Sequence, residues 1–217
     1  KCMEAISVFD MLKVGVGPSS SHTLGHWRAI QRWLFELDES GEIHDVDHIQ
    51  VFLYGSLALT GRGHATDKAI CLGLLGEEPE TIETAKINEL IDHLCLVKVV
   101  NLLGKKVVPF DPIADILYLK TERLPFHSNG MKCVASVKGE IKEEFFYSIG
   151  GGFIVKEGEK ADVAGKVKLP YPCHNASELQ EFCEQGAMKI SDMVWANEQS
   201  WHPKEEVEAR IWNIWEV

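Results

Sequence analysis

Two glycine-bracketed turns carry the side chains best suited to chemistry. The first presents several hydroxyls and an imidazole, and its candidate ligand-binding residues are Ser19, Ser20, Ser21, His22 and Thr23. A turn stiffened by glycine and proline that leads into a helix also offers free backbone amides, which suit a carboxylate. A serine-rich helix cap is the simpler alternative, and it stays open at this point.

The second turn, residues 61–68, places His64 among small neighbours and leads into a helix through Thr66, Asp67 and Lys68. A histidine held in this way is a candidate for moving a proton or for orienting an anion. The competing interpretation is an ordinary surface histidine followed by two solvated charges.

A third polar turn, His127-Ser128-Asn129-Gly130, lies between two predicted strands. Asparagine and glycine both tolerate positive φ, so a plain turn explains the stretch as well as a binding role does. His22 and His26 are four residues apart on a predicted helix, but no HExxH pattern or nearby cysteine accompanies them. No metal site is therefore predicted in this chain.

The elements that must position these turns follow from hydrophobic periodicity. Apolar residues from Leu24 to Leu37 mark one helical face that ends before Ser40-Gly41, and a second helix spans 66–75 before Gly76. A third helix is predicted near 87–96. Alternating or apolar runs predict strands at 47–59, 99–103, 116–119, 132–137, 141–147 and 153–155, with a tight hairpin at 138–140. Consecutive strands without intervening helices predict an α+β fold with a mainly antiparallel sheet packed by helices.

The C-terminal part of the chain differs in composition. Residues 157–175 are charged and rich in glycine and proline, which predicts a linker, and helices are expected at 177–201 and 203–217. The scheme is a main domain at 1–156, a linker at 157–175 and a helical extension at 176–217. Four of the six tryptophans lie in this extension, and its last helix has no glycine cap, so we expect it to lead into a further domain.

Overall composition excludes several classes of protein. Thirty-three acidic residues against 22 basic ones give a formal charge of −11, which disfavours nucleic acid as a partner. The six cysteines are scattered, as expected of free thiols in a reducing compartment. No secretion signal and no apolar run of about 20 residues is present. The sequence therefore predicts a cytoplasmic protein that makes no membrane contact.

Five blocks of the sequence follow one another in a set order: Ser-Val-Phe-Asp-Met at 7–11, Gly-Pro-Ser-Ser-Ser-His-Thr at 17–23, the stretch 55–68, His-Ser-Asn-Gly-Met at 127–131 and Tyr-Ser-Ile-Gly-Gly-Gly-Phe at 147–153. Taken together and in this order, they resemble the β domain of bacterial iron–sulfur L-serine dehydratases. The sequence departs from the family pattern at His26, where proline is typical, and at Ala65, where glycine is frequent.

The resemblance implies a sandwich similar to allosteric substrate-binding domains, and the elimination of water from L-serine to give pyruvate and ammonia. It implies a homodimer and an α domain or subunit that holds a [4Fe–4S] cluster, whose iron acts as a Lewis acid. The cluster ligands are not recognisable in this chain, so the fragment alone is expected to be inactive. Carried over to this sequence, the catalytic candidates are His64 and His127, and the substrate-binding candidates are Ser19, Ser20, Ser21, His22, Thr23, Thr66, Asp67, Lys68, Ser128 and Asn129.

Two alternatives stay open beside this interpretation. The β domain also resembles the regulatory module of some phosphoglycerate dehydrogenases, which would make the chain a sensor of L-serine or a related small anion. The other alternative is a dimerisation domain without catalytic residues. A proton-transfer group such as His64 would distinguish an enzyme from a pure sensor.

Overall fold

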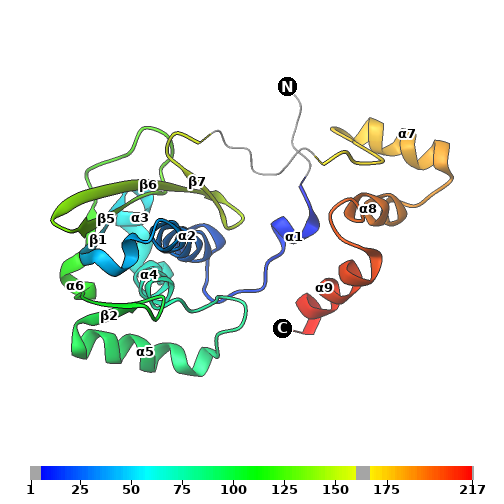
Figure 1. Ribbon diagram of the computed structural model, residues 1–217. Coiled ribbons are helices and arrows are strands. Elements are labelled where there is room, and N and C mark those ends of the chain that lie inside the picture. The colour runs from blue at the N-terminus through cyan, green and yellow to red at the C-terminus, as the bar shows by residue number, and fades with distance from the viewer. Residues whose placement is uncertain (1–5, 160–166, 217) are drawn as a thin grey trace. The chain divides into compact units, whose positions relative to one another are not determined.

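The computed structural model describes residues 6–159 and 167–216. They form two compact units, one of residues 15–159 and the other of residues 6–14 together with 167–216. Figure 1 shows the helices and strands of both units. In the described ranges, no helix is both long enough and apolar enough to cross a membrane.

The larger unit is built on a mixed five-stranded sheet and a separate hairpin. Its strands are β1 (Val46–Tyr54), β2 (Val99–Leu102), β3 (Lys106–Pro109), β4 (Ile116–Leu119), β5 (Gly130–Val137), β6 (Glu140–Gly150) and β7 (Phe153–Lys156). The sheet has the order β4-β1-β5-β6-β7, and β2 pairs with β3. Only the β1–β4 pair of the sheet is parallel, which confirms the predicted α+β fold with a mainly antiparallel sheet.

The predicted hairpin between β5 and β6 is confirmed. Val137 pairs with Glu140, so the loop consists of the two residues between them. Both loop residues have positive φ, 52° at Lys138 and 83° at Gly139. This backbone matches the two-residue turn that suits the twist of antiparallel strands.

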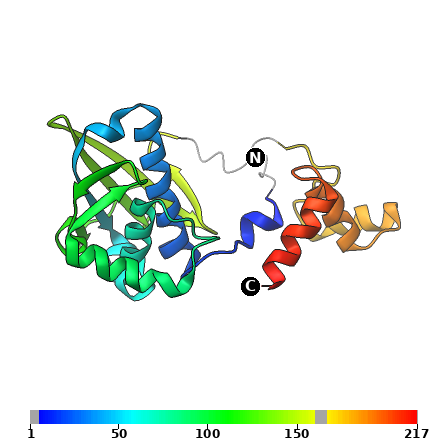
Figure 2. The ribbon, with the colours of Figure 1, turned by 60° about the horizontal axis from the view of Figure 1, so that its bottom comes forward.

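Helices cover one face of this sheet (Figures 1 and 2). The helical elements of the unit are η1 (Ser20–Leu24, a π-helix), α2 (Gly25–Glu39), η2 (Glu42–Asp45), α3 (Gly55–Thr60), η3 (Gly61–His64), α4 (Thr66–Leu75), α5 (Thr84–Val97) and α6 (Pro112–Asp115). The apolar sides of α2 and α4 enter the main core, where Ile30, Leu34 and Ile70 are fully buried together with Leu53 and Phe146 of the sheet. Burial of these apolar side chains supplies the main driving force for folding.

Glycine ends both core helices where the sequence predicts. α2 stops just before Ser40 and Gly41, and Gly41 has φ +75°. α4 stops at Leu75, and Gly76 follows with φ +84°. These positive values belong to the left-handed region, which ends a helix at little steric cost only for glycine.

The strand predicted at 47–59 is too long at its C-terminal end. β1 ends at Tyr54 because Gly55 adopts φ +52°, and the chain then turns into α3. A Cβ atom on residue 55 would lie 2.6 Å from the carbonyl oxygen of Ser128, closer than a real contact allows. Gly55 therefore redirects the chain and lets the loop after Phe126 approach its backbone.

The smaller unit joins both ends of the chain. It contains α1 (Val8–Met11), α7 (Ala176–Gly186), α8 (Ile190–Glu198) and α9 (Lys204–Glu216). The single helix predicted at 177–201 is interrupted at Ala187, which has φ 47°. The α9 range agrees with the helix predicted after Pro203.

The predicted domain scheme stays a prediction, and part of its linker lies outside the described residues. Among the described residues, 6–14 belong to the same compact unit as the C-terminal helices. The carboxylate of Glu198 accepts hydrogen bonds from Ser7 Oγ at 2.6 Å and from Val8 N at 2.8 Å.

Candidate active site

The first histidine turn is a short π-helix held from both sides. Ser19 caps it, because its Oγ accepts a hydrogen bond from the backbone N of His22 at 3.2 Å. On the other side, Gly17 has φ +116°, and a Cβ at this position would lie 2.4 Å from Cγ2 of Thr23. Gly17 permits a tight turn just before the π-helix η1, which contains His22 and leads directly into α2.

The second histidine is fixed by its own backbone segment. His64 Nδ1 lies 3.0 Å from the carbonyl oxygen of Thr60. Since a carbonyl can only accept, Nδ1 carries the proton, and in the neutral ring Nε2 keeps its lone pair. Ala65 follows with φ 55° and is the N-cap residue of α4, so the turn places a residue other than glycine in the left-handed region.

Two threonines link these turns reciprocally. Thr23 Oγ1 donates to the carbonyl oxygen of His64, and Thr66 Oγ1 donates to the carbonyl oxygen of His22, both at 2.7 Å. Both threonines are buried. The two imidazole rings consequently face each other, with centroids 4.9 Å apart and planes inclined by 31°. We call this pair of hydrogen bonds the threonine clamp.

Hydroxyl groups surround the His22 ring. Its Nδ1 lies 3.0 Å from Ser21 Oγ and 3.5 Å from Ser19 Oγ, and its Nε2 lies 3.2 Å from Ser56 Oγ. Burial lowers the pKa of His22, and the neighbouring His64 lowers it further. A neutral His22 beside a second imidazole can therefore donate or accept at either nitrogen without carrying a fixed charge.

The third predicted turn joins this group through its backbone. Ser56 N donates to the carbonyl oxygen of Ser128 at 3.0 Å. Within the loop, Asn129 N donates to His127 Nδ1 at 3.1 Å, and the carbonyl oxygen of Asn129 accepts from Ser148 N at 3.0 Å. In the part of the chain that the structure describes, no hydrogen bond or ring contact links His127 to His64.

Several predicted site residues have other roles or positions. The hydroxyls of Thr23 and Thr66 are used by the threonine clamp and face backbone oxygens. Lys68 Nζ contacts Asn88 Oδ1 of α5 at 2.9 Å, and Asp67 Oδ1 accepts from the backbone N of Lys68. Ser20 and Ser128 have exposed side chains. The clustered candidates are Ser19, Ser21, His22 and His64.

The sequence interpretation missed two residues, Ser56 and His26. Ser56 contacts His22 Nε2, and its position directly after a buried strand and a glycine was the available signal. His26 is 1% exposed and lies one helical turn beyond His22. Burial first, and the nearby His22 second, lower the pKa of His26 to about 3. The unusual histidine at this position was noticed in the sequence, but no role was assigned to it.

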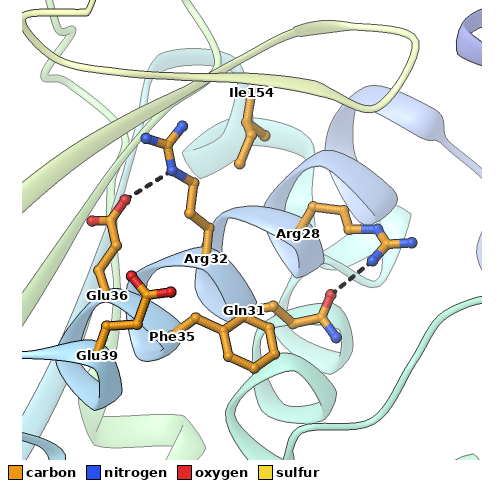
Figure 3. Close-up of a pocket in the computed structure, with 7 residues that line it drawn as sticks. All are labelled: Arg28, Gln31, Arg32, Phe35, Glu36, Glu39 and Ile154. Atoms are coloured by element: carbon orange, nitrogen blue, oxygen red, sulfur yellow. Dashed lines mark hydrogen bonds and ion pairs between the residues drawn. The ribbon is translucent and has the colours of Figure 1, made fainter. Parts of the chain in front are cut away.

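A surface hollow on the other side of α2 is a weaker candidate (Figure 3). It encloses about 460 Å³ and is lined by Arg28, Gln31, Arg32, Phe35, Glu36, Glu39 and Ile154. Its guanidinium groups are already paired, Arg28 with Glu78 and Glu80 and Arg32 with Glu36 and Glu159. None of the predicted site residues lines this hollow, so the histidine turns remain the candidate active site.

The described residues do not fit an iron–sulfur cluster. Among them, no group of three or more His, Cys, Asp or Glu side chains is arranged to hold a metal ion. Burial raises the pKa of the Cys71 and Cys133 thiols, which disfavours the thiolate form that ligates iron. Cys95, Cys173 and Cys183 are half-buried free thiols on separate segments.

Comparison with known proteins agrees with this architecture. Residues 7–159 match the family model described as serine dehydratase beta chain. The chain is 40% identical to L-serine dehydratase TdcG of Escherichia coli over 220 residues, covering 98% of this chain and 47% of that protein. It is 34% identical to an L-serine dehydratase of Streptomyces coelicolor, covering 98% and 48%, and 34% identical to one of Helicobacter pylori, covering 88% and 43%.

The chain therefore belongs to the serine dehydratase β-chain family. It spans about half the length of the curated relatives it matches. The matched residues 7–159 include all five sequence blocks. Four of these blocks lie in the larger unit.

Proposed function

We propose that the chain is the β part of an L-serine dehydratase that converts L-serine to pyruvate and ammonia in the cytoplasm. It acts with an α domain or subunit, in which the family resemblance places a [4Fe–4S] cluster. The threonine clamp is the observation that carries this proposal, because it fixes two histidines face to face beside three serine hydroxyls. Such an arrangement suits a substrate that has both a carboxylate to be held and a proton to be moved.

In this proposal each group has a role that follows from its bonds. His64 Nε2 accepts a proton, because Nδ1 is held by Thr60. Hydroxyls of Ser19, Ser21 and Ser56 donate to the substrate carboxylate, and neutral His22 orients them. His127 and Asn129 act as secondary donors from the adjoining loop.

Helices α8 and α9 have exposed apolar side chains that could contact the α domain or subunit. In the smaller unit, the side chains of Trp212 and Trp215 are 62% and 79% exposed, and Ile190 of α8 is 55% exposed. Aromatic side chains are enriched at protein interfaces relative to the rest of the surface. We propose that α8 and α9 contact the α part of the enzyme.

Pyruvate formation tests the proposed activity directly. The intact protein, expressed anaerobically, should convert L-serine to pyruvate in an assay coupled to lactate dehydrogenase, and the 217-residue chain alone should not. D-serine is the matched control substrate, and it should give no pyruvate. An intact protein that does not convert L-serine would remove the proposal.

A regulatory sensor is the second candidate, because the Ser19, Ser21 and Ser56 hydroxyls converge within this chain alone. Calorimetric titration of the isolated chain with L-serine distinguishes the two. Tight binding by the wild type, unchanged in a His64→Ala variant, would favour the sensor. Weak or absent binding favours a site that is complete only with the α part.

The homodimer implied by the family resemblance belongs to the same proposal. Light scattering over a range of concentrations should give twice the chain mass. A strict monomer at every concentration would remove this part of the proposal and leave the others standing.

A further inference from the structure

Three buried polar side chains near the His22 turn have hydrogen-bonding atoms without a protein partner. His26 and Ser148 are each 1% exposed, and Asn129 is 8% exposed. Both ring nitrogens of His26, Oδ1 of Asn129 and Oγ of Ser148 make no hydrogen bond with any residue that the structure describes. We call these three residues the His26 cluster.

Their backbones bring the three residues together. Ser148 N donates to the carbonyl oxygen of Asn129 at 3.0 Å. The hydroxyl of Ser148 lies against Gly25, where a side chain would not fit, because a Cβ on residue 25 would lie 2.3 Å from Ser148 Oγ. His26 follows Gly25 directly, and the backbones of His22, Asn129 and Ser21 act to raise the pKa of its ring. None of these backbone groups makes a hydrogen bond of normal geometry with either ring nitrogen.

Burying these atoms without a hydrogen-bond partner would lower the free energy of unfolding. A buried donor or acceptor without a partner destabilises a protein by roughly tenfold in the unfolding equilibrium constant. Four such atoms in one small region are unusual, because buried polar groups in folded proteins nearly always have a protein or water partner. A bound molecule that the chain itself does not supply would satisfy them.

The hydrogen-bond donors and acceptors of the His26 cluster indicate which kind of molecule it would bind. Neutral imidazole offers one N–H donor and one lone pair, Asn129 Oδ1 only accepts, and the Ser148 hydroxyl does both. His22 is the titratable neighbour that acts on His26, and it too is held toward its neutral form. An anion would meet Asn129 Oδ1, which can only accept, and among the described residues no group of three or more His, Cys, Asp or Glu side chains is arranged for a metal ion. Water can donate two bonds and accept two.

We propose that the His26 cluster is a buried hydration site, in which ordered water bridges His26, Asn129 and Ser148. The water joins the start of α2 to the 127–130 loop and to the end of β6. It therefore adds a link between the His22 turn and the third polar turn, beside the contact between Ser56 and Ser128. The site is independent of the proposed activity, because it requires only this chain.

A high-resolution crystal structure of the chain tests the site directly. Water should lie within hydrogen-bonding distance of at least two of the three side chains. In solution, a cross-peak between water and the His26 ring protons should be present in the wild type. A dry cluster, or a His26 ring whose nitrogens both bond directly to protein groups, would overturn the proposal.

Unfolding measurements on variants of His26 and Ser148 test the same proposal without crystals. His26→Leu and Ser148→Ala should show non-additive effects on urea unfolding, with a coupling of at least about fivefold in the equilibrium constant, because both contact one water network. His26→Gln, which retains a donor and an acceptor, should lose less than His26→Leu. The matched control pair, His93→Leu with Ser148→Ala, should be additive, because His93 is exposed on α5. Additive effects of His26→Leu and Ser148→Ala would contradict a bridging water.

Discussion

At the scale of single residues, the candidate site depends on which ring nitrogen carries a proton. The Thr60 carbonyl fixes the proton of His64 on Nδ1, while the surroundings of His22 are hydroxyls that accept or donate. One imidazole therefore has a defined orientation and the other can adapt. Sequence analysis identified His22 and His64 as candidate site residues, but it contained no information about which ring nitrogen carries the proton.

His26 predicts a specific dependence of stability on pH. Its pKa is about 3 in the folded chain and 6.5 in the unfolded one, so its contribution is complete above pH 6.5 and declines as the pH falls toward 3. At pH 5 the loss should be about 2 kcal/mol. Urea unfolding of the wild type and of His26→Leu at pH 7.5 and 5 measures it. Equal pH dependence in the two proteins would show that His26 titrates normally.

Ala65 predicts a stabilising substitution. Its φ of 55° lies in the left-handed region, which costs an L-residue other than glycine about 1–2 kcal/mol. Ala65→Gly should raise the free energy of unfolding by about 0.5–1 kcal/mol, after the greater freedom of unfolded glycine is subtracted. The control Ala85→Gly, exposed on the α5 helix, should lower it. If Ala65→Gly lowers it too, the strain at residue 65 is absent.

At the scale of elements, glycine and proline signals predicted helix ends better than strand ends. Gly41 and Gly76 end α2 and α4 as expected, because their left-handed backbone follows from glycine itself. The end of β1 was missed because Gly55 lies within an apolar run, and its φ depends on the approach of Ser128 from a distant segment. Pairings such as β1 with β4 were also beyond sequence patterns, since they depend on tertiary packing.

The start of α2 approaches β6 closely at Gly25. Gly25→Ala would place Cβ 2.3 Å from Ser148 Oγ and 2.9 Å from Ser148 Cβ, so one element must move. The free energy of unfolding should fall by about 1–3 kcal/mol, as for other overpacked positions. Gly63→Ala is the control, because a Cβ there meets no atom within 4 Å. Similar unfolding midpoints for the two variants would rule out a close contact at Gly25.

At the scale of the whole molecule, the five sequence blocks divide between the two units. The first block, at residues 7–11, contributes no residue to the histidine site, and Ser7 instead contacts Glu198 of α8. The other blocks supply the two histidine turns, the 127–130 loop and the end of β6. Together and in order, the blocks supported the family resemblance, which implied the site residues. The threonine clamp and the role of Ser56 depend instead on contacts between distant segments.

The joining of the two chain ends gives a prediction about local opening. Glu198 is buried and accepts two hydrogen bonds from residues 7 and 8, so Glu198→Ala leaves a buried donor without a partner. Amide hydrogen exchange at residues 8–12 should accelerate about tenfold or more. Glu208→Ala, exposed on α9, is the control and should leave exchange unchanged. Unchanged exchange in Glu198→Ala would show that residues 6–14 are held by other contacts.

The rate at which the intact protein with His64→Ala converts L-serine is the most direct test of the proposed function. If His64 Nε2 moves the substrate proton, kcat should fall at least about 100-fold while the iron content stays unchanged. His93→Ala, which removes an exposed histidine of the same unit, should retain wild-type turnover. Wild-type kcat in the His64→Ala enzyme would contradict the assignment of the two histidine turns as the active site.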